Sequence, residues 1–83
     1  MKVNAATDAK LVEIGERICA ARKRAGMSQA ALAEKIGMYR ENLIRIEKGR
    51  VNLTVETLLR IAEGLEVDLR VAFARRSTAS SKR

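Results

Sequence analysis

Arg40 and Glu41 stand side by side in the sequence, and both side chain types can recognise the edges of base pairs. An arginine can donate two hydrogen bonds to O6 and N7 of guanine, and a glutamate can accept one from the N4 amino group of cytosine. Arg45 follows further along the same predicted helix, and Ile44 offers an apolar contact for a thymine methyl group. A solvated helix face would explain the same residues without any function, so the interpretation depends on the elements that position them.

Two short helices joined by a tight turn are predicted around these residues. Ser28 can cap the first helix, because its hydroxyl can accept a hydrogen bond from a free backbone N–H, and Gly37 ends that helix. The second helix runs roughly from Arg40 to Lys48 and stops at Gly49. Apolar residues mark the inward faces of both helices: Leu32, Ala33, Ile36, Leu43 and Ile46. A short helix that begins with base-reading side chains and is braced by a partner helix fits the major groove of DNA.

One further helix on each side completes the predicted core. Thr7 or Asp8 can cap the first, whose apolar residues recur in steps of three and four: Leu11, Ile14, Ile18, Ala21 and Ala25. Gly15 inside it costs about 1 kcal/mol relative to alanine and would allow another helix to pack closely. Thr54 caps the last helix, whose apolar stripe comprises Leu58, Leu59, Ile61, Ala62 and Leu65. The predicted fold class is therefore all-α, with four to five helices.

Residues 67–74 change the pattern from helical to alternating. Val67, Leu69, Val71 and Phe73 alternate with charged or small residues, which is typical of a strand. The chain offers no second strand to satisfy the backbone groups of this one, so we expect it to pair with the same strand of another subunit across a two-fold axis. A fifth helix docked on the bundle is the alternative.

The length of 83 residues allows one small domain. We expect a flexible leader over residues 1–7, a helix-turn-helix domain over 8–66, a dimerisation strand over 67–74 and a disordered basic tail over 75–83. Aromatic residues are nearly absent, so the core must be built from aliphatic side chains, which suits packed helices. Dimerisation would add stability to a core of this size.

Positive charge gathers in two parts of the chain. The net charge is +7 at pH 7. Residues 22–50 hold eight basic residues against three acidic ones, and residues 70–83 hold five basic residues and no acidic one. Such a field favours nucleic acid as the partner, although charge alone is equally typical of a solvated basic surface.

The residue types argue against catalytic and metal-binding chemistry. The chain has no histidine and a single cysteine, Cys19, so an internal disulfide is impossible and a zinc site lacks its usual ligands. Carboxylates are scattered over predicted solvent faces, so we expect neither an enzyme nor a cofactor. No apolar run approaches the roughly 20 residues of a membrane span and no signal peptide is evident, so we expect a cytoplasmic protein.

The spacing of these residues resembles the DNA-binding domain of the lambda-repressor/Cro family, also called Xre-type helix-turn-helix proteins. The resemblance covers about residues 11–66, where a set of positions falls in register: Arg22, Ser28, Gln29, Leu32, Ala33, Gly37, Leu43, Ile46, Glu47 and Gly49. It implies a set of DNA-contacting residues, namely Gln29, Arg40, Glu41 and Arg45. It also implies a partly buried ion pair between Arg22 and Glu47, which joins the first helix to the recognition helix.

Five residues are expected at the sugar–phosphate backbone: Ser28, Gln29, Tyr39, Lys48 and Arg50. The amino end of a helix can approach a phosphate through its backbone amides, which favours Ser28 and Gln29. Lys48 and Arg50 flank the end of the recognition helix. Tyr39 departs from the family, in which Ser or Thr commonly caps that helix. Its hydroxyl could still reach a phosphate oxygen, or its ring could pack at a protein interface.

Together these features predict a homodimeric transcriptional repressor that binds an inverted-repeat operator, one recognition helix per half-site. The helices followed by residues 67–74 and a loose tail are also similar to the HipB-type antitoxins. That resemblance implies the alternative of an antitoxin that binds a toxin protein and regulates its own operon. A nonspecific architectural protein is a third interpretation, favoured only by the basic tail.

Overall fold

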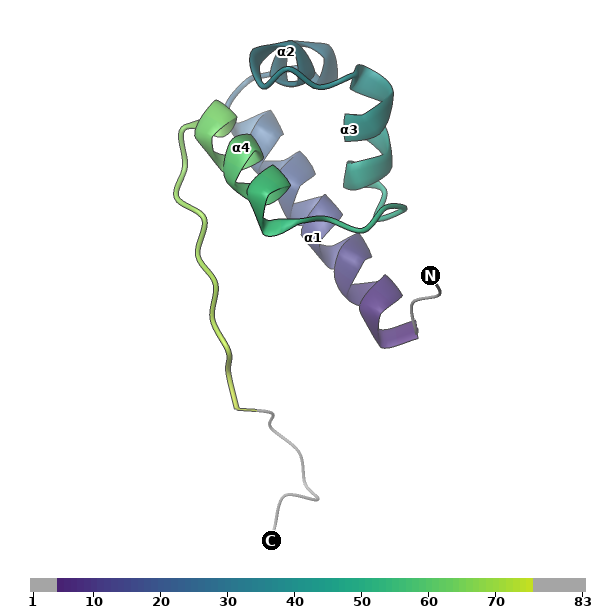
Figure 1. Ribbon diagram of the computed structural model, residues 1–83. Helices are drawn as coiled ribbons and strands as arrows, with labels where there is room; N and C mark the ends of the chain where they lie inside the picture. The colour runs from purple at the N-terminus through teal and green to yellow at the C-terminus, as the bar shows by residue number, and fades with distance from the viewer. Residues whose placement is uncertain (1–4, 76–83) are drawn as a thin grey trace, which may run out of the picture.

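The computed structural model describes residues 5–75, which form four helices and an extended C-terminal segment (Figure 1). The helices are α1 (Ala5–Arg24), α2 (Gln29–Lys35), α3 (Arg40–Glu47) and α4 (Val55–Leu65). No strand is assigned within residues 5–75. The predicted all-α class is confirmed, with four helices in the described part of the chain. None of those helices is long and apolar enough to cross a membrane.

The first helix begins earlier than its capping residues suggested. Residues 5–7 are already helical, so Thr7 and Asp8 lie within α1 rather than at its start. The predicted flexible leader therefore differs from the structure over residues 5–7, and its other residues, 1–4, lie outside the described part. Asp8 remains in the first turn, where a negative charge interacts favourably with the helix dipole.

Side chains from outside each helix form hydrogen bonds with backbone groups at the ends of α2 and at the start of α4. Ser28 Oγ accepts a hydrogen bond from the Ala31 amide, and Thr54 Oγ1 accepts one from the Thr57 amide, both at 3.0 Å. At the other end of α2, the guanidinium of Arg60 donates to the carbonyl of Ile36. The two hydroxyl caps agree with the sequence, whereas the Arg60 contact joins α4 to α2 in a way that no local pattern indicates.

The core lies where the four helices meet. Leu32, Leu43 and Ile61 are fully buried, one each from α2, α3 and α4. The remaining buried apolar residues surround them: Ile18, Ala33, Ile46, Ala62 and Leu65. Leu59, a member of the predicted apolar stripe of α4, does not join the core, because its side chain is 52% exposed at the margin of α4, beside the extended segment.

Two glycines let α1 approach the end of α3 closely. A Cβ atom at Gly15 would lie 2.5 Å from the carbonyl oxygens of both Ile46 and Glu47, nearer than real Cβ atoms come to a neighbour. Gly49, just after α3, has a φ of +72° and lies against the backbone of Val12. The close packing expected at Gly15 is therefore present, and its partner is the last turn of α3.

The chain leaves α4 through Glu66, which has a φ of 59°, and then runs extended over residues 67–75. The amide of Val67 still bonds to the carbonyl of Ala62, at 3.0 Å. The alternative of a fifth helix is wrong for these residues, while pairing with a second subunit stays a prediction. The predicted basic tail lies outside the described residues, apart from Arg75.

Candidate nucleic-acid interface

The turn between α2 and α3 fixes the angle at which the two helices meet. The amide of Met38 donates to the carbonyl of Ala33 at 2.8 Å, and the amide of Gly37 donates to that of Glu34 at 3.2 Å. Gly37 has a φ of +70°, which an L side chain rarely adopts. This turn therefore presents α3 as a separate helix on one side of the molecule (Figure 1).

One face of α3 is exposed and polar, and the other is part of the core. Arg40, Glu41 and Arg45 are exposed, and Ile44 beside them is half-buried. On the opposite face, Leu43 and Ile46 are 0% and 4% exposed. We call the first set, Arg40, Glu41, Ile44 and Arg45, the reading face. The helical repeat thus brings the four predicted base-reading residues to one surface.

Asn42 holds one member of the reading face in place. Its side-chain oxygen accepts a hydrogen bond from Nη1 of Arg45 at 3.1 Å, across one turn of α3. This contact restricts the guanidinium to one side of the helix and leaves its other N–H groups available. Sequence reasoning left open whether Asn42 is buried and gave it no contact with Arg45. Asn42 is exposed, and its spacing of three residues from Arg45 is the signal that could have found this contact.

A buried ion pair joins α1 to the last turn of α3, the helix that carries the reading face. Arg22 in α1 donates from Nε to Glu47 Oε2 at 2.7 Å and from Nη2 to Glu47 Oε1 at 3.0 Å. The side chains are only 9% and 5% exposed, respectively. Nη1 of Arg22 also donates to the carbonyl of Met27 at 2.9 Å, and Nη2 lies 3.5 Å from Sγ of Cys19. The arginine thereby joins α1, the loop before α2 and the end of α3.

Gln29 extends this network to the start of α2. Its Nε2 donates to Glu47 Oε1 at 3.0 Å. The side chain expected at a DNA phosphate is therefore bonded to Glu47, with one N–H of its amide still unused by that bond. Ser28, the neighbouring residue expected at the backbone, is exposed and accepts from the Ala31 amide.

These contacts shift the titration of the buried pair. Burial by itself raises the pKa of Glu47, but hydrogen bonds from Arg22 and Gln29 outweigh it, so the pKa lies below its ordinary value of 4.5. The hydrogen bond to Glu47 also raises the pKa of Arg22. Both groups are therefore charged at neutral pH, which leaves no uncompensated buried charge.

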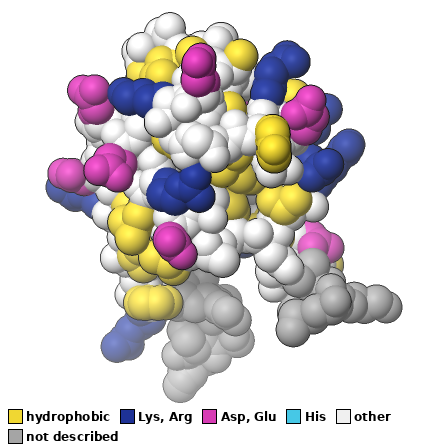
Figure 2. Space-filling view, turned by 45° about the horizontal axis from the view of Figure 1, so that its top comes forward, with side chains coloured by type: hydrophobic (Ala, Val, Ile, Leu, Met, Phe, Trp, Pro, Cys, Tyr) yellow, Lys and Arg dark blue, Asp and Glu magenta, His cyan; other side chains and the backbone are white. Residues whose placement is uncertain are grey.

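The remaining predicted contacts surround the reading face. Tyr39 occupies the cap position of α3 with no side-chain hydrogen bond to the helix, and its side chain is 79% exposed. Lys48 and Arg50 are exposed just beyond the last turn. Figure 2 shows Lys and Arg side chains gathered along its right-hand edge, the side on which Figure 1 draws α3. This side of the molecule therefore offers positive charge around a narrow polar helix.

Comparison with known proteins agrees with this geometry. Residues 20–71 match the family model described as helix-turn-helix. A solved structure of the restriction-modification controller protein C.AhdI from Aeromonas hydrophila is 31% identical, with a TM-score of 0.71 over 74% of this chain and 88% of that one. No curated protein sequence matches this chain.

Two further solved structures share the fold. An HTH_3 family transcriptional regulator from Vibrio cholerae is 32% identical, with a TM-score of 0.70 over 75% of this chain and 35% of its own length. This chain therefore corresponds to about a third of that regulator. A structure titled MDT Protein is 23% identical, with a TM-score of 0.67 over 90% of this chain and 99% of that one, and it supports the fold alone.

Proposed function

Because this chain belongs to the helix-turn-helix family of DNA-binding transcriptional regulators, we propose that it is a repressor that binds an inverted-repeat operator as a homodimer. The family binds DNA rather than catalysing a reaction. The observation that carries the proposal is the exposed reading face of α3, together with the buried ion pair of Arg22 and Glu47 that joins α3 to α1. Such a repressor would act on the DNA of its own cell, in the cytoplasm.

The reading face supplies sequence recognition in this proposal. Arg40, at the first position of α3, donates to O6 and N7 of a guanine, and Glu41 accepts from a cytosine N4. Arg45, held by Asn42, reaches a base further along the groove. Ile44 contacts a thymine methyl group. Each arginine contact contributes discrimination of about 1–3 kcal/mol at its own base pair.

The surrounding residues set position and general affinity. Ser28 and Gln29 bring the start of α2 to one phosphate, and Gln29 uses its remaining N–H for that contact. Lys48 and Arg50 contribute charge at the other end of the reading face. The hydroxyl of Tyr39 donates to a phosphate oxygen between these two regions. None of these contacts distinguishes one base from another.

A homodimer explains how so small a reading face reaches useful specificity. One α3 helix contacts only a few base pairs, whereas a two-fold dimer places two of them on half-sites about one helical turn or more apart. The proposed dimerisation strand lies in the C-terminal segment and presents four apolar residues: Val67, Leu69, Val71 and Phe73, of which Leu69 is half-buried and the others are exposed. Binding of RNA polymerase would be blocked wherever such an operator overlaps a promoter.

Selection of bound fragments from a genomic DNA library, followed by footprinting, tests this proposal. We expect one enriched inverted repeat, protected in two successive major grooves. Arg45→Ala should lose preference at a base pair in each half-site. Lys35→Ala, which changes an exposed lysine on α2 outside the reading face, is the matched control and should keep that preference. Equal binding to all fragments at physiological ionic strength would show that the operator proposal is wrong.

The antitoxin function is a second candidate, favoured by one observation. Phe73 is 100% exposed and Val71 is 69% exposed, so the C-terminal segment offers apolar surface that a toxin protein could also cover. Co-expression with the product of the adjacent gene separates the two functions. A complex of fixed stoichiometry supports the antitoxin, and the absence of any complex removes it.

A further inference from the structure

The C-terminal segment presents unpaired backbone and a two-sided pattern of side chains. Within residues 5–75, no backbone hydrogen bond joins residues 68–75 to another segment. Leu69 is half-buried, whereas its neighbours on the same alternating face, Val67 and Val71, are 47% and 69% exposed. An extended chain with free N–H and C=O groups is a template for another strand. The segment therefore offers an edge to which a second strand can be added.

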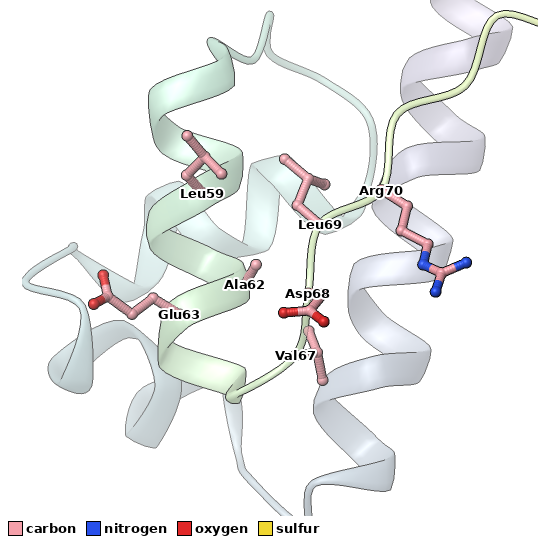
Figure 3. Close-up of a pocket in the computed structure, with 7 residues that line it drawn as sticks. All are labelled: Leu59, Ala62, Glu63, Val67, Asp68, Leu69 and Arg70. Atoms are coloured by element: carbon pink, nitrogen blue, oxygen red, sulfur yellow. The ribbon is translucent and has the colours of Figure 1, made fainter.

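A shallow groove lies between this segment and α4. Figure 3 shows the residues that line its volume of about 700 Å³: Leu59, Ala62, Glu63, Val67, Asp68, Leu69 and Arg70. Leu59 and Leu69 contribute apolar side chains to this lining, and Asp68 and Arg70 contribute one charge of each sign. An occupant therefore needs apolar residues and both charges at matching spacing, and the same segment of a second copy has them.

We propose that residues 67–71 pair antiparallel with the same residues of a second copy, in the register that places Leu69 opposite Leu69 of the partner subunit. The inference rests on the proposed homodimer and goes further by fixing which residues face each other. In an antiparallel pair the numbers of two opposite residues have a constant sum, so each register places the two-fold axis either through a residue or between two residues.

Matching of the two faces removes half of the possible registers. Directly opposite residues of an antiparallel pair lie on the same face of the ribbon. A register with its axis between two residues would set Leu69 against Arg70 of the partner subunit and mix the apolar face with the charged one. A shift by one residue turns every side chain to the other face, so such registers are disfavoured. The axis must pass through a residue.

Charge then selects one residue for the axis. An axis through Arg70 places it opposite Arg70 of the partner subunit, and an axis through Asp68 places two carboxylates opposite each other. Both arrangements are unfavourable, because like charges directly opposite each other repel. An axis through Val71 leaves Asp68 and Arg70 opposite alanines. Only an axis through Leu69 pairs Asp68 with Arg70 of the partner subunit, and it does so twice. The same register sets Val67 against Val71 of the partner subunit, so the apolar face is matched throughout.

This pairing leaves the DNA side of the molecule open. Figure 1 draws the extended segment and α3 at opposite sides of the fold. A two-stranded ribbon at the segment would turn its apolar face toward Leu59, which is exposed in one subunit alone. The ribbon would therefore cover apolar surface without touching the reading face.

Disulfide trapping in a Cys19→Ser background tests the register. Serine keeps an acceptor for Arg22, and the background removes the native thiol. We expect Leu69→Cys to form a cross-linked dimer rapidly with oxidised glutathione, because opposite Cα atoms lie about 4.5–5.5 Å apart, within the range that a disulfide spans. Val71→Cys, on the same face, is the matched control. In the proposed register it stands opposite Val67 of the partner subunit, four positions away from residue 71 of that subunit, so it should cross-link at least tenfold more slowly. Faster cross-linking of Val71→Cys overturns the register.

A charge exchange provides an independent test that leaves the apolar face intact. Asp68→Arg and Arg70→Asp each create two like-charge contacts, so each should weaken dimerisation by about tenfold or more in sedimentation equilibrium. The double variant restores opposite charges and should recover most of the loss. No recovery overturns the register while a dimeric wild type still supports the proposed function. A wild type that stays monomeric on its operator contradicts the homodimer itself.

Discussion

The carboxylate of Glu47 and the guanidinium of Arg22 form two hydrogen bonds, at 2.7 and 3.0 Å, although the residues lie 25 positions apart. The pair joins the longest helix to the last turn of the reading helix. Because both side chains are almost fully buried, neither can exchange its partner for water without opening the fold. The orientation of the reading face therefore depends on a buried contact between α1 and the last turn of α3.

Arg22→Met should destabilise the protein strongly. Methionine replaces the aliphatic part of the arginine side chain but leaves the Glu47 carboxylate buried without its cation. We expect this to lower the free energy of unfolding by about 3–5 kcal/mol. Urea denaturation followed by circular dichroism measures the loss. The double variant Arg22→Met with Glu47→Leu removes both charges and should recover much of the stability. An unchanged midpoint for the single variant would contradict a structural role for the pair.

Stability should fall in acid through Glu47. Its pKa is lower in the folded protein than its ordinary value of 4.5, so the unfolded chain binds more protons between the two values. The stabilisation is then fully present above about pH 4.5 and is lost as the pH falls through the folded pKa. Glu47→Gln should be less stable than the wild type at pH 7 and should show a shallower decline below pH 4.5. Parallel curves for the two proteins would show that another group controls acid unfolding.

Arg45→Ala and Lys48→Ala should weaken DNA binding in different ways. Loss of Arg45 should weaken the free energy of binding to the operator by about 1–3 kcal/mol. It should have little effect on binding to an operator in which the base pair contacted by Arg45 has been changed. Loss of Lys48 should weaken binding to every sequence alike and reduce the slope of log affinity against log salt by about 0.9. Fluorescence anisotropy over a salt series separates the two effects. Equal losses of both variants on all sequences would remove Arg45 from the reading face.

Tyr39→Ser should stabilise the protein and still weaken DNA binding. Tyr39 takes the cap position of α3 without capping it, and serine there should add about 1 kcal/mol of stability. Serine is too short to replace the phenol at a phosphate. Thermal denaturation and operator affinity test the two effects, and Tyr39→Phe isolates the hydroxyl. Unaltered affinity of Tyr39→Phe would exclude the phosphate contact and leave the ring free for a protein interface.

Gly15→Ala should destabilise the fold in spite of a better helix propensity. Alanine is favoured over glycine by about 1 kcal/mol within a helix. Its methyl group would, however, lie 2.5 Å from the carbonyl oxygens of Ile46 and Glu47, so α1 and α3 must separate. We expect a net loss of about 1–3 kcal/mol in chemical denaturation, as for an overpacked core. Glu16→Ala, at the exposed neighbouring position, should lie within about 0.5 kcal/mol of the wild type.

Local patterns predicted most of the fold. Apolar periodicity placed the helices, and the hydroxyls of Ser28 and Thr54 marked the starts of α2 and α4 because capping involves residues close in sequence. Periodicity did not predict the exposure of Leu59, because an apolar pattern along one helix does not show which of its residues are covered by neighbouring helices. The helical residues 5–7 were missed because Thr7 and Asp8 are typical capping residues, although the alanines at positions 5 and 6 favour a helix.

Contacts between distant residues were beyond such patterns. Arg60 reaches the end of α2, and Gln29 reaches Glu47, through side chains that meet only after the helices have packed. The pairing of Arg22 with Glu47 was expected from family resemblance rather than from spacing. The base-reading residues gather on one face of α3, but their roles in recognition stay predictions.

The distance between the reading face and the C-terminal segment has an evolutionary consequence. In the proposed dimer, substitutions at Arg40 or Arg45 would change which operator is bound and leave the choice of subunit untouched. Exchange of the charges at Asp68 and Arg70 would do the reverse. Duplicate genes of this kind could diverge in one cell without forming mixed dimers. The opposite charges of Asp68 and Arg70 would then keep one regulatory circuit separate from the next.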